Sequence, residues 1–418
     1  MTHIEQMIKD MCPNGVEWRT FDELGTFYGG LSGKTKDDFK DGNAKFITYL
    51  NIANNPALRL DIEDTVQIGP NEKQNIVQYG DALFTGSSET PDECAMSSVV
   101  TEHPTENLYL NSFCFGFRFN SLNGIEPAFF KHYFRSNHFR TAVRRTANGT
   151  TRFNVSKKEF AKLEIPIPPI EIQKKIVECL DKFSALAAEL QAELQAELQK
   201  RRTQYEYYRT QLLTPPPTES NSADKTDDAR WEWKTLVEIA TVQYGYPFEA
   251  DKFTDDTNFI PLIRIRDVVP AMASTYYEGE YPKEYIVKKG DILVGMDGNF
   301  NLEKWNDRDG LLNQRVCKIY SKDENILLND YIYHYLRPEF KKIENEIKGG
   351  TVKHLSAARI KQIEIPVPPI KEQKKIADAL NLFTKIIQDM EEGIPAEQAA
   401  QQKRYEYYRD KLLTFSKP

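Results

Sequence analysis

The chain repeats part of itself once, and this repeat limits the architectures that it can adopt. The segment IPIPPIEIQKKIVECLDKF, from Ile165 to Phe183, returns as IPVPPIKEQKKIADALNLF, from Ile365 to Phe383. The pattern YEYYR..LLT then occurs at residues 205–214 and again at 405–414, at the same offset. Such a repeat predicts two copies of one structural arrangement.

Upstream of these blocks the two halves match more weakly. EWRTFDEL, FITYLNI, GDALF and LNSFC in the first half resemble EWKTLVEI, FIPLIRI, GDILV and LNQRVC in the second. Each half therefore has a fixed part and a variable part. We expect the fixed parts to hold something common and the variable parts to select different targets.

The variable parts predict mixed α/β globules. Short runs of Val, Ile, Phe and Tyr, separated by Gly, Asn, Asp and Pro, are typical of strands joined by turns. Helices are predicted over 127–147 and 330–348. In each fixed part, closely spaced prolines predict an extended segment that is followed by a long helix.

Each long helix carries an apolar stripe at three- and four-residue spacing. The stripe in the first copy comprises Ile170, Ile176, Val177, Leu180, Phe183, Leu186 or Ala187, Leu190, Leu194 and Leu198. The stripe in the second copy comprises Ile370, Ile376, Ala377, Leu380, Phe383 and Ile387. We expect the two stripes to pack together as an antiparallel coiled-coil pair.

Composition excludes several classes of protein. The chain has no run of eighteen apolar residues and no signal-peptide core at its start, so we expect a cytoplasmic protein without membrane contact. A net charge of −7 argues against a protein that coats nucleic acid indiscriminately. Residues 131–162 nevertheless hold nine Lys or Arg against one acid, which predicts either a local cationic surface or an ordinary solvated helix face.

Each candidate catalytic motif lacks a residue that its chemistry requires. GGLSGKT resembles a phosphate-binding loop, but Tyr28 occupies the position of its first glycine. The Pro-Pro pairs are followed by Ile170 and Ile370, where an adenine methyltransferase needs an aromatic residue. The six histidines show no metal-ligand spacing, and no nuclease carboxylate cluster or G-x-S-x-G motif is evident, so we expect neither catalysis nor a metal.

The doubled proline-rich blocks, each leading into a long helix and a YEYYR..LLT ending, resemble the conserved regions of type I restriction–modification specificity subunits. The resemblance covers the whole chain. It implies an α+β fold with two target-recognition domains of mixed α/β structure, separated by two long antiparallel helices. It also implies a non-catalytic subunit that reads a bipartite double-stranded DNA target and docks two methyltransferase subunits. S-adenosylmethionine and ATP would bind to the methyltransferase and the translocase-nuclease subunits, and no cofactor to this chain.

The corresponding boundaries follow from the repeat. Target-recognition domain 1 spans 1–164 and the central spacer helix 165–214, followed by a linker at 215–229 that is rich in Pro and polar residues. Target-recognition domain 2 spans 230–364 and the second spacer helix 365–418. The tetrapeptide AELQ occurs three times in tandem between Ala188 and Gln199. In the family that the chain resembles, similar tandem tetrapeptides set the gap between half-sites.

Candidate DNA-reading residues lie in loops that combine cations, amides, hydroxyls and glycines, the groups that contact phosphates and base edges. In the first half they are Lys34, Lys36, Ser87, Ser88, Arg144, Arg145, Asn148, Thr150, Thr151, Arg152 and Asn154. In the second half they are Arg264, Arg266, Asn299, Asn301, Gln314, Arg315, Lys348, Gly350, Thr351, Lys353 and His354. For any one of them an ordinary turn or surface role competes with base contact.

The YEYYR..LLT tails, with Glu171, Gln173, Glu372 and Gln373, are candidates for docking surfaces, although simple helix packing explains them equally well. Two other functions remain open. The helical pair could dimerise in a scaffold whose globules bind proteins or glycans. An enzyme that turns over S-adenosylmethionine by itself ranks third.

Overall fold

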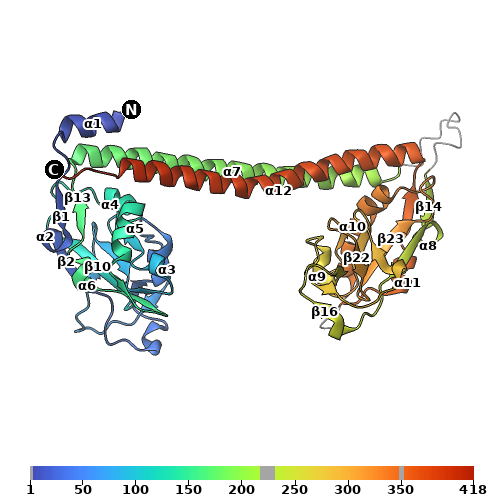
Figure 1. The fold of residues 1–418 in the computed structure, drawn as a ribbon, viewed down its shortest axis with the longest axis horizontal. Coiled ribbons are helices and arrows are strands. Elements are labelled where there is room, and N and C mark those ends of the chain that lie inside the picture. Colours follow the sequence, from blue (N-terminus) through green and yellow to red (C-terminus); the bar gives the residue numbers. More distant parts are fainter. Residues whose placement is uncertain (1–2, 217–230, 348–352) are drawn as a thin grey trace. The chain divides into compact units, whose positions relative to one another are not determined.

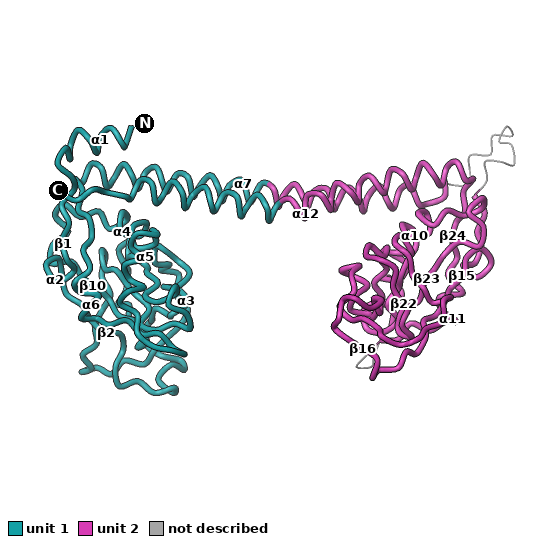
Figure 2. Tube along the Cα trace, viewed as in Figure 1, with its two compact units in different colours: residues 1–193, 394–418 teal, residues 194–393 magenta. Residues whose placement is uncertain are grey.

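The computed structural model describes residues 3–216, 231–347 and 353–418 (Figure 1). The chain forms two compact units: unit 1 contains residues 1–193 and 394–418, and unit 2 contains residues 194–393 (Figure 2). Each unit combines a sheet-containing globule with part of the long helices α7 (Ile170–Leu213) and α12 (Ile370–Leu412). The predicted α+β class is confirmed. From residue 217 onward the expected linker lies outside the described residues.

The globule of unit 1 contains four small sheets. Their strand orders are β1 (Trp18–Thr20) with β13 (Glu164–Pro166); β2 (Gly25–Gly29), β10 (Cys114–Phe119), β6 (Ala82–Thr85) and β8 (Ser97–Val99); β4 (Thr65–Val66), β3 (Ala44–Ile47), β9 (Leu108–Leu110) and β5 (Ile76–Val77); and β11 (Ala147–Asn148), β12 (Phe153–Val155) and β7 (Ser87–Ser88). The short helices are α1 (His3–Met11), α2 (Phe21–Leu24), η1 (Lys36–Phe39), α3 (Tyr49–Asn54), η2 (Pro91–Glu93), α4 (Pro127–Tyr133), α5 (Asn137–Arg144) and α6 (Lys157–Phe160).

Among its described residues, the globule of unit 2 contains three sheets. Their strand orders are β14 (Glu232–Thr235) with β24 (Glu364–Val367); β15 (Ala240–Tyr244), β23 (Val316–Ser321), β20 (Ile292–Gly295) and β21 (Leu302–Lys304); and β16 (Phe253–Thr254), β18 (Tyr276–Tyr277), β17 (Ile260–Ile263), β22 (Gly310–Leu312) and β19 (Ile286–Val287). The shorter helices are α8 (Leu236–Ile239), η4 (Ala250–Lys252), α9 (Ile265–Val268), η5 (Lys283–Tyr285), α10 (Asn329–Glu346) and α11 (Ala357–Lys361).

The two globules share one topology. β2, β10, β6 and β8 correspond to β15, β23, β20 and β21, and the parallel pair β3–β9 corresponds to β17–β22. A glycine lies at the same close approach in both: a Cβ at Gly30 would meet the carbonyl oxygen of Asn111 at 2.0 Å, and one at Gly245 that of Asn313 at 2.0 Å. Three of the four weak upstream sequence matches therefore reflect equivalent backbone positions. The match of FITYLNI with FIPLIRI is wrong by three residues, because Ile47 pairs with Leu110 as Ile263, and not Ile260, pairs with Leu312.

Aromatic residues dominate the core of unit 1. Phe21 is fully buried and lies edge-on to Phe117, with ring centroids 4.8 Å apart, and it also contacts Phe84, Phe134 and Phe160. Such pairs add about 0.5–1.5 kcal/mol each beyond the burial of their area. Thr20 caps the helix that begins at Phe21 through a capping box with Glu23, which fixes the backbone that carries this ring.

The long helices run antiparallel within each unit. In unit 1 the ring of Phe183, near the start of α7, lies 6.0 Å from that of Tyr408, near the end of α12. In unit 2 the ring of Tyr208, near the end of α7, lies 5.5 Å from that of Phe383, near the start of α12. The predicted antiparallel pairing is confirmed inside both units. Among the described residues, none of the helices combines the length and apolarity needed to cross a membrane.

The predicted apolar stripe of α7 is wrong at Leu190, and of the two alternatives Leu186 and Ala187 it is Ala187 that faces inward. Leu186 and Leu190 are exposed, whereas Ala187, Gln191 and Leu194 face inward and Leu198 is buried. Four helical residues rotate the chain by about 400°, so a leucine in every tetrapeptide drifts by about 40° per repeat. Of the three AELQ leucines, Leu190 therefore leaves the inward face of α7, and Gln191 takes its place at heptad spacing with Ala187, Leu194 and Leu198.

The single helix predicted over 127–147 is also wrong, because the structure has two helices there. α4 ends at Tyr133, and the hydroxyl of Ser136 accepts a hydrogen bond from the N–H of Phe139 to start α5. A side-chain cap of this kind satisfies an N–H group that the helix cannot satisfy itself. In unit 2 the equivalent helix α10 is continuous through Glu346.

Candidate nucleic-acid interface

Two of the predicted DNA-reading segments of the first half meet in one small sheet. Strand β12 pairs with both β7 and β11, which places Asn154 opposite Ser87 on one side and opposite Asn148 on the other. The N–H of Val155 also donates to the carbonyl of Gly86 at 3.3 Å, and the N–H of Gly86 joins this sheet to a third loop by donating to the carbonyl of Phe113 at 2.8 Å. We call residues 86–88, 113 and 147–155 the unit 1 platform.

Most polar side chains of the unit 1 platform are exposed. Asn148, Thr150, Thr151, Arg152 and Asn154 all face solvent. The hairpin between β11 and β12 depends on Gly149, which has a φ of 142° and would place a Cβ 2.1 Å from the carbonyl oxygen of Arg152. The hairpin therefore presents a cation, amides and hydroxyls together, which are the groups that read nucleic acid.

The serines of the platform have internal partners. Ser88 is buried and donates to the carbonyl of Thr90 at 2.5 Å, while the carbonyl of Ser87 accepts from the hydroxyl of Tyr49 at 2.9 Å. Ser87 and Ser88 line a hollow of about 520 Å³ together with Phe113 and Arg152. Ser88 thus helps to shape the platform, and Ser87 remains a candidate contact.

The basic segment 131–162 divides into internal and surface cations. Arg135 donates to the carbonyls of Ser97 and Ile52 at 2.9 and 2.8 Å, and burial lowers its pKa to about 10. Arg140 likewise donates to the carbonyl of Ala95 at 2.7 Å. Arg144 and Arg145 are exposed beside the platform, and Arg144 lies 3.0 Å from Asp92.

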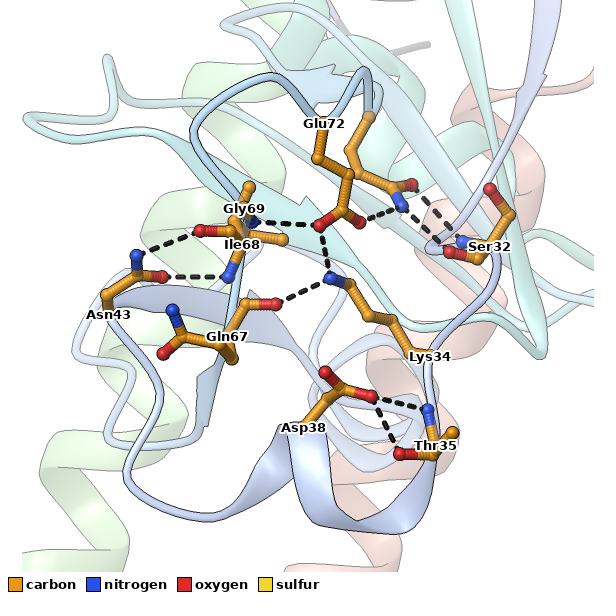
Figure 3. A network of polar contacts seen from close by, with 10 residues as sticks. Ser32, Lys34, Thr35, Asp38, Asn43, Gln67, Ile68, Gly69 and Glu72 are labelled. Carbon is orange, nitrogen blue, oxygen red and sulfur yellow. Dashed lines mark hydrogen bonds and ion pairs between the residues drawn. The ribbon is translucent and has the colours of Figure 1, made fainter.

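Lys34 lies inside its loop. Its ammonium group donates to the carbonyl of Gln67 at 2.6 Å and to the carboxylate of Glu72 at 2.5 Å, with 7% of its side chain exposed (Figure 3). The N–H of Gly69, then Lys34 and Gln74, lower the pKa of Glu72 to about 2. Lys34 therefore braces the loop, whereas Lys36, in η1, is exposed and open to a ligand.

Three predicted segments of the second half also meet. The carboxylate of Asp297 accepts a hydrogen bond from Nδ1 of His354 at 2.6 Å and forms an ion pair with Arg315. Burial acts to raise the pKa of Asp297, but the hydrogen bonds from His354 and Arg315 outweigh it, so this pKa lies below its ordinary value. We call residues 296–298, 315 and 353–355 the unit 2 platform.

The two platforms share one backbone framework. In unit 2 the N–H of Met296 donates to the carbonyl of Arg315 at 3.0 Å, and the N–H of Leu355 to that of Met296 at 2.8 Å. These bonds repeat the Gly86–Phe113 and Val155–Gly86 bonds of unit 1. Asp297 and His354 form an antiparallel bridge where Ser87 and Asn154 pair in unit 1. The side chains differ, so the framework is common and the exposed chemistry is not.

The remaining predicted residues of unit 2 are dispersed. Their placements are as follows: Arg264 is half-buried, with its guanidinium 5.9 Å from the ring centre of Phe253; Arg266 donates to the hydroxyls of Ser274 and Thr275 at 2.9 and 2.6 Å; Asn299 and Gln314 are exposed; Asn301 is half-buried; and Lys353 donates to the carbonyl of Glu344 at 2.6 Å. Lys348, Gly350 and Thr351 lie outside the described residues.

Sequence reasoning missed two residues of the platforms. Phe113 is 66% exposed, and Asp297 is the acceptor that holds Arg315 and His354 together. The alignment of LNSFC with LNQRVC already paired Phe113 with Arg315. A phenylalanine aligned with an arginine between otherwise similar residues of the repeat was a usable signal, whereas nothing local distinguished Asp297 from other loop acids.

Equivalent histidines attach each globule to both long helices. His132 is buried, accepts from the hydroxyl of Tyr405 at 2.9 Å through Nδ1, and donates from Nε2 to Asp181 at 2.7 Å. His334 makes the same contacts with Tyr205 at 3.1 Å and Asn381 at 2.9 Å. Burial lowers the pKa of both, that of His334 to about 4. Both rings therefore stay neutral at pH 7.

Buried glutamines complete the attachment. Gln173 accepts from the N–H of Glu126 and donates to the carbonyls of Gly124 and Pro168, at 2.9, 2.8 and 2.7 Å. Gln373 makes three matching bonds, and neither side chain is exposed. Gln173 and Gln373 are therefore packing residues and not docking surfaces. Within the described ranges, no group of three or more potential metal ligands is present.

The type I restriction modification DNA specificity domain family matches residues 13–200 and 229–398. The Escherichia coli EcoBI specificity subunit is 38% identical over 151 residues, covering 36% of this chain and 32% of its own length. A putative specificity subunit of Haemophilus influenzae is 33% identical over 276 residues, covering 64% of this chain and 68% of its own. This chain thus spans about a third of the length of the first relative and about two thirds of the second.

The fold has a close counterpart among solved structures. A chain from a study of complex assembly and conformational transition in the type I restriction–modification system superposes with a TM-score of 0.70 at 16% identity, covering 96% of this chain and 98% of that one. At this identity the likeness concerns the fold alone. The family match over both halves shows that this chain belongs to the type I restriction–modification DNA specificity family.

Proposed function

We propose that this chain is the DNA-recognition subunit of a type I restriction–modification complex, with one unit for each half of a bipartite target. The observation that carries the proposal is the shared backbone framework of the two platforms, which bears different exposed side chains in each unit. Proteins read base sequence through such side chains, while the framework sets their position. Two different half-sites are the expected consequence.

The chain supplies recognition, and its partners supply the chemistry. Two methyltransferase subunits that bind S-adenosylmethionine, and ATP-driven translocase-nuclease subunits, are the partners that this function requires. Tyr207 and Tyr407 are 60% and 62% exposed at equivalent positions of α7 and α12. The hydroxyls of Tyr205 and Tyr405, in contrast, bond to the buried rings of His334 and His132. We therefore place the methyltransferase contacts at Tyr207 and Tyr407. Loss of co-purification with Tyr207→Ala and Tyr407→Ala, at unchanged thermal stability, is the expected result.

Methylation mapping tests the function directly. Host DNA is sequenced by a long-read method with the gene present and absent, in cells that carry the methyltransferase partner. A methylated bipartite sequence that disappears with the gene is expected. A scaffold would leave the methylation pattern unchanged and would show no sequence preference in gel-shift assays with random duplexes, with or without the methyltransferase. Turnover of S-adenosylmethionine by the purified chain alone would support the enzyme alternative.

A further inference from the structure

Asp297 holds two exposed donors at the surface of unit 2. Its side chain is 15% exposed, whereas those of Arg315 and His354 are each 60% exposed. Arg315 bonds to one carboxylate oxygen through Nη1, and His354 bonds to the other through Nδ1. A nearly buried carboxylate thus holds one nitrogen of each of two side chains that remain largely exposed to solvent.

The backbone fixes Asp297 itself. The neighbouring N–H of Met296 donates to the carbonyl of Arg315 at 3.0 Å, and that of Gly298 donates to the carbonyl of Lys353 at 2.8 Å. The low pKa of Asp297 keeps its carboxylate ionised at neutral pH. Arg315 is therefore restrained both at its backbone and at its guanidinium group, which lowers the entropy that a ligand contact would cost.

A restrained guanidinium group suits one base in particular. Arginine carries five N–H donors in a planar fork, and Asp297 engages Nη1. The remaining donors suffice for a bidentate contact with O6 and N7 of guanine in the major groove. A phosphate is a poorer ligand here, because the carboxylate of Asp297 offsets the positive charge that attracts phosphates but leaves the direction of the free N–H groups intact.

The equivalent position of unit 1 lacks any side-chain donor. Phe113 occupies the backbone position of Arg315, as the matching Gly86 and Met296 hydrogen bonds show, and its ring is 66% exposed. A phenyl ring contacts the methyl group of thymine and cannot bond to guanine acceptors. One position of a shared framework therefore carries two different base preferences.

We propose that Arg315, oriented by Asp297, recognises a guanine in the half-site that unit 2 binds. This inference rests on the proposed DNA-recognition function and adds the base identity and the residue that selects it. Arg315 is the contacting residue, and Asp297 is a positioning residue that acts through it.

The test compares methylated sequences produced by variants of the full chain in cells with the methyltransferase partner. Arg315→Lys keeps the charge but loses the fork, and Arg315→Gln loses both. We expect each to reduce the preference for one G·C pair in a single half-site by roughly five- to 150-fold, with the other half-site unchanged. Asp297→Asn should weaken the preference at the same pair to a smaller degree.

A matched control is Arg359→Lys, because Arg359 is also an exposed arginine of unit 2 that is paired with a carboxylate, that of Glu346. It should leave both half-sites unchanged. Equal weakening on all sequences by Arg315→Gln would identify a phosphate contact and overturn the proposal, as would an unaltered half-site or one without any G·C pair. Absence of a methylated bipartite sequence with the unaltered chain would instead overturn the proposed function.

Discussion

Replacing Gln373 by methionine tests whether the buried glutamines attach the globules to the helices. The side chain is fully buried, and its carbonyl oxygen accepts from the N–H of Leu328 at 2.9 Å. Its amide group donates to the carbonyls of Ile326 and Pro368, both at 2.8 Å. Methionine has nearly the same length and shape but can replace none of these three hydrogen bonds.

The expected loss of stability follows from the three backbone groups that lose their hydrogen bonds to Gln373. A buried hydrogen bond contributes about 0.5–1.5 kcal/mol, and a buried donor that loses its partner costs about 1–3 kcal/mol. The near-isosteric replacement avoids most of the cavity cost that alanine would add. We expect the free energy of opening of unit 2 to fall by about 3–5 kcal/mol.

Hydrogen exchange followed by mass spectrometry measures this loss for each unit separately. Gln373→Met should lower protection in unit 2, and Gln173→Met should lower it by a similar amount in unit 1. Lys374→Met is the control, since Lys374 is an exposed neighbour whose ion pair with Asp378 lies at the surface, and it should change stability by less than about 0.5 kcal/mol. A loss below about 1 kcal/mol for Gln373→Met, or an equal loss in both units, would refute the reasoning.

Three further outcomes are expected. Deletion of one AELQ unit, residues 192–195, removes roughly 6 Å of helix and should shorten the gap between half-sites by one or two base pairs, as seen in the methylated sequence; an unchanged gap would exclude a spacer role. Arg145→Gln should reduce the slope of log binding constant against log salt by about 0.9 while leaving base preference intact, and an unchanged slope would rule out a phosphate contact. Because His334 has a pKa of about 4 in the folded state against 6.5 in the unfolded chain, the unfolded state binds more protons between these values. Stability of unit 2 should therefore fall by up to about 3 kcal/mol as the pH drops from about 6.5 to 4, in urea unfolding followed at a series of pH values, and His334→Gln should remove most of that dependence.

The repeated blocks allowed the architecture to be predicted, because helix propensity and apolar spacing are local properties. The start of α7 at Ile170 follows Pro169, whose carbonyl accepts the first helical hydrogen bonds from Ile172 and Gln173. The antiparallel pairing followed from two stripes that each needed a partner. The inward face of α7 was harder to predict, because residues four apart rotate by about 40° around the helix axis at each repeat. The sequence does not show at which repeat the leucine turns away from the partner helix.

The platforms were only partly predictable, because the presence of a Lys or Arg in the sequence does not show whether its side chain bonds inside the protein or faces solvent. Arg135 and Arg152 belong to the same basic segment, yet Arg135 donates to carbonyls 38 and 83 residues away in sequence while Arg152 is exposed. Lys34 similarly donates a hydrogen bond to Glu72, 38 residues further along the chain. Such pairings depend on the packing of distant strands, so the sequence indicated the candidate loops but not which of their side chains are exposed.

The two attachment sites differ in the side chain at residue 181 or 381 and in the charged residue of the globule that contacts it. Asp181 of unit 1 accepts from His132 and pairs with Lys131 at 2.8 Å, whereas the equivalent Asn381 donates to Asp330 at 2.6 Å. A globule carrying Lys131 would lose its carboxylate opposite an asparagine. One carrying Asp330 would face a second carboxylate opposite Asp181, which like charges at this distance disfavour. The two globules share a fold, but the side chains at residues 181 and 381 match each globule to its own segment of the long helices.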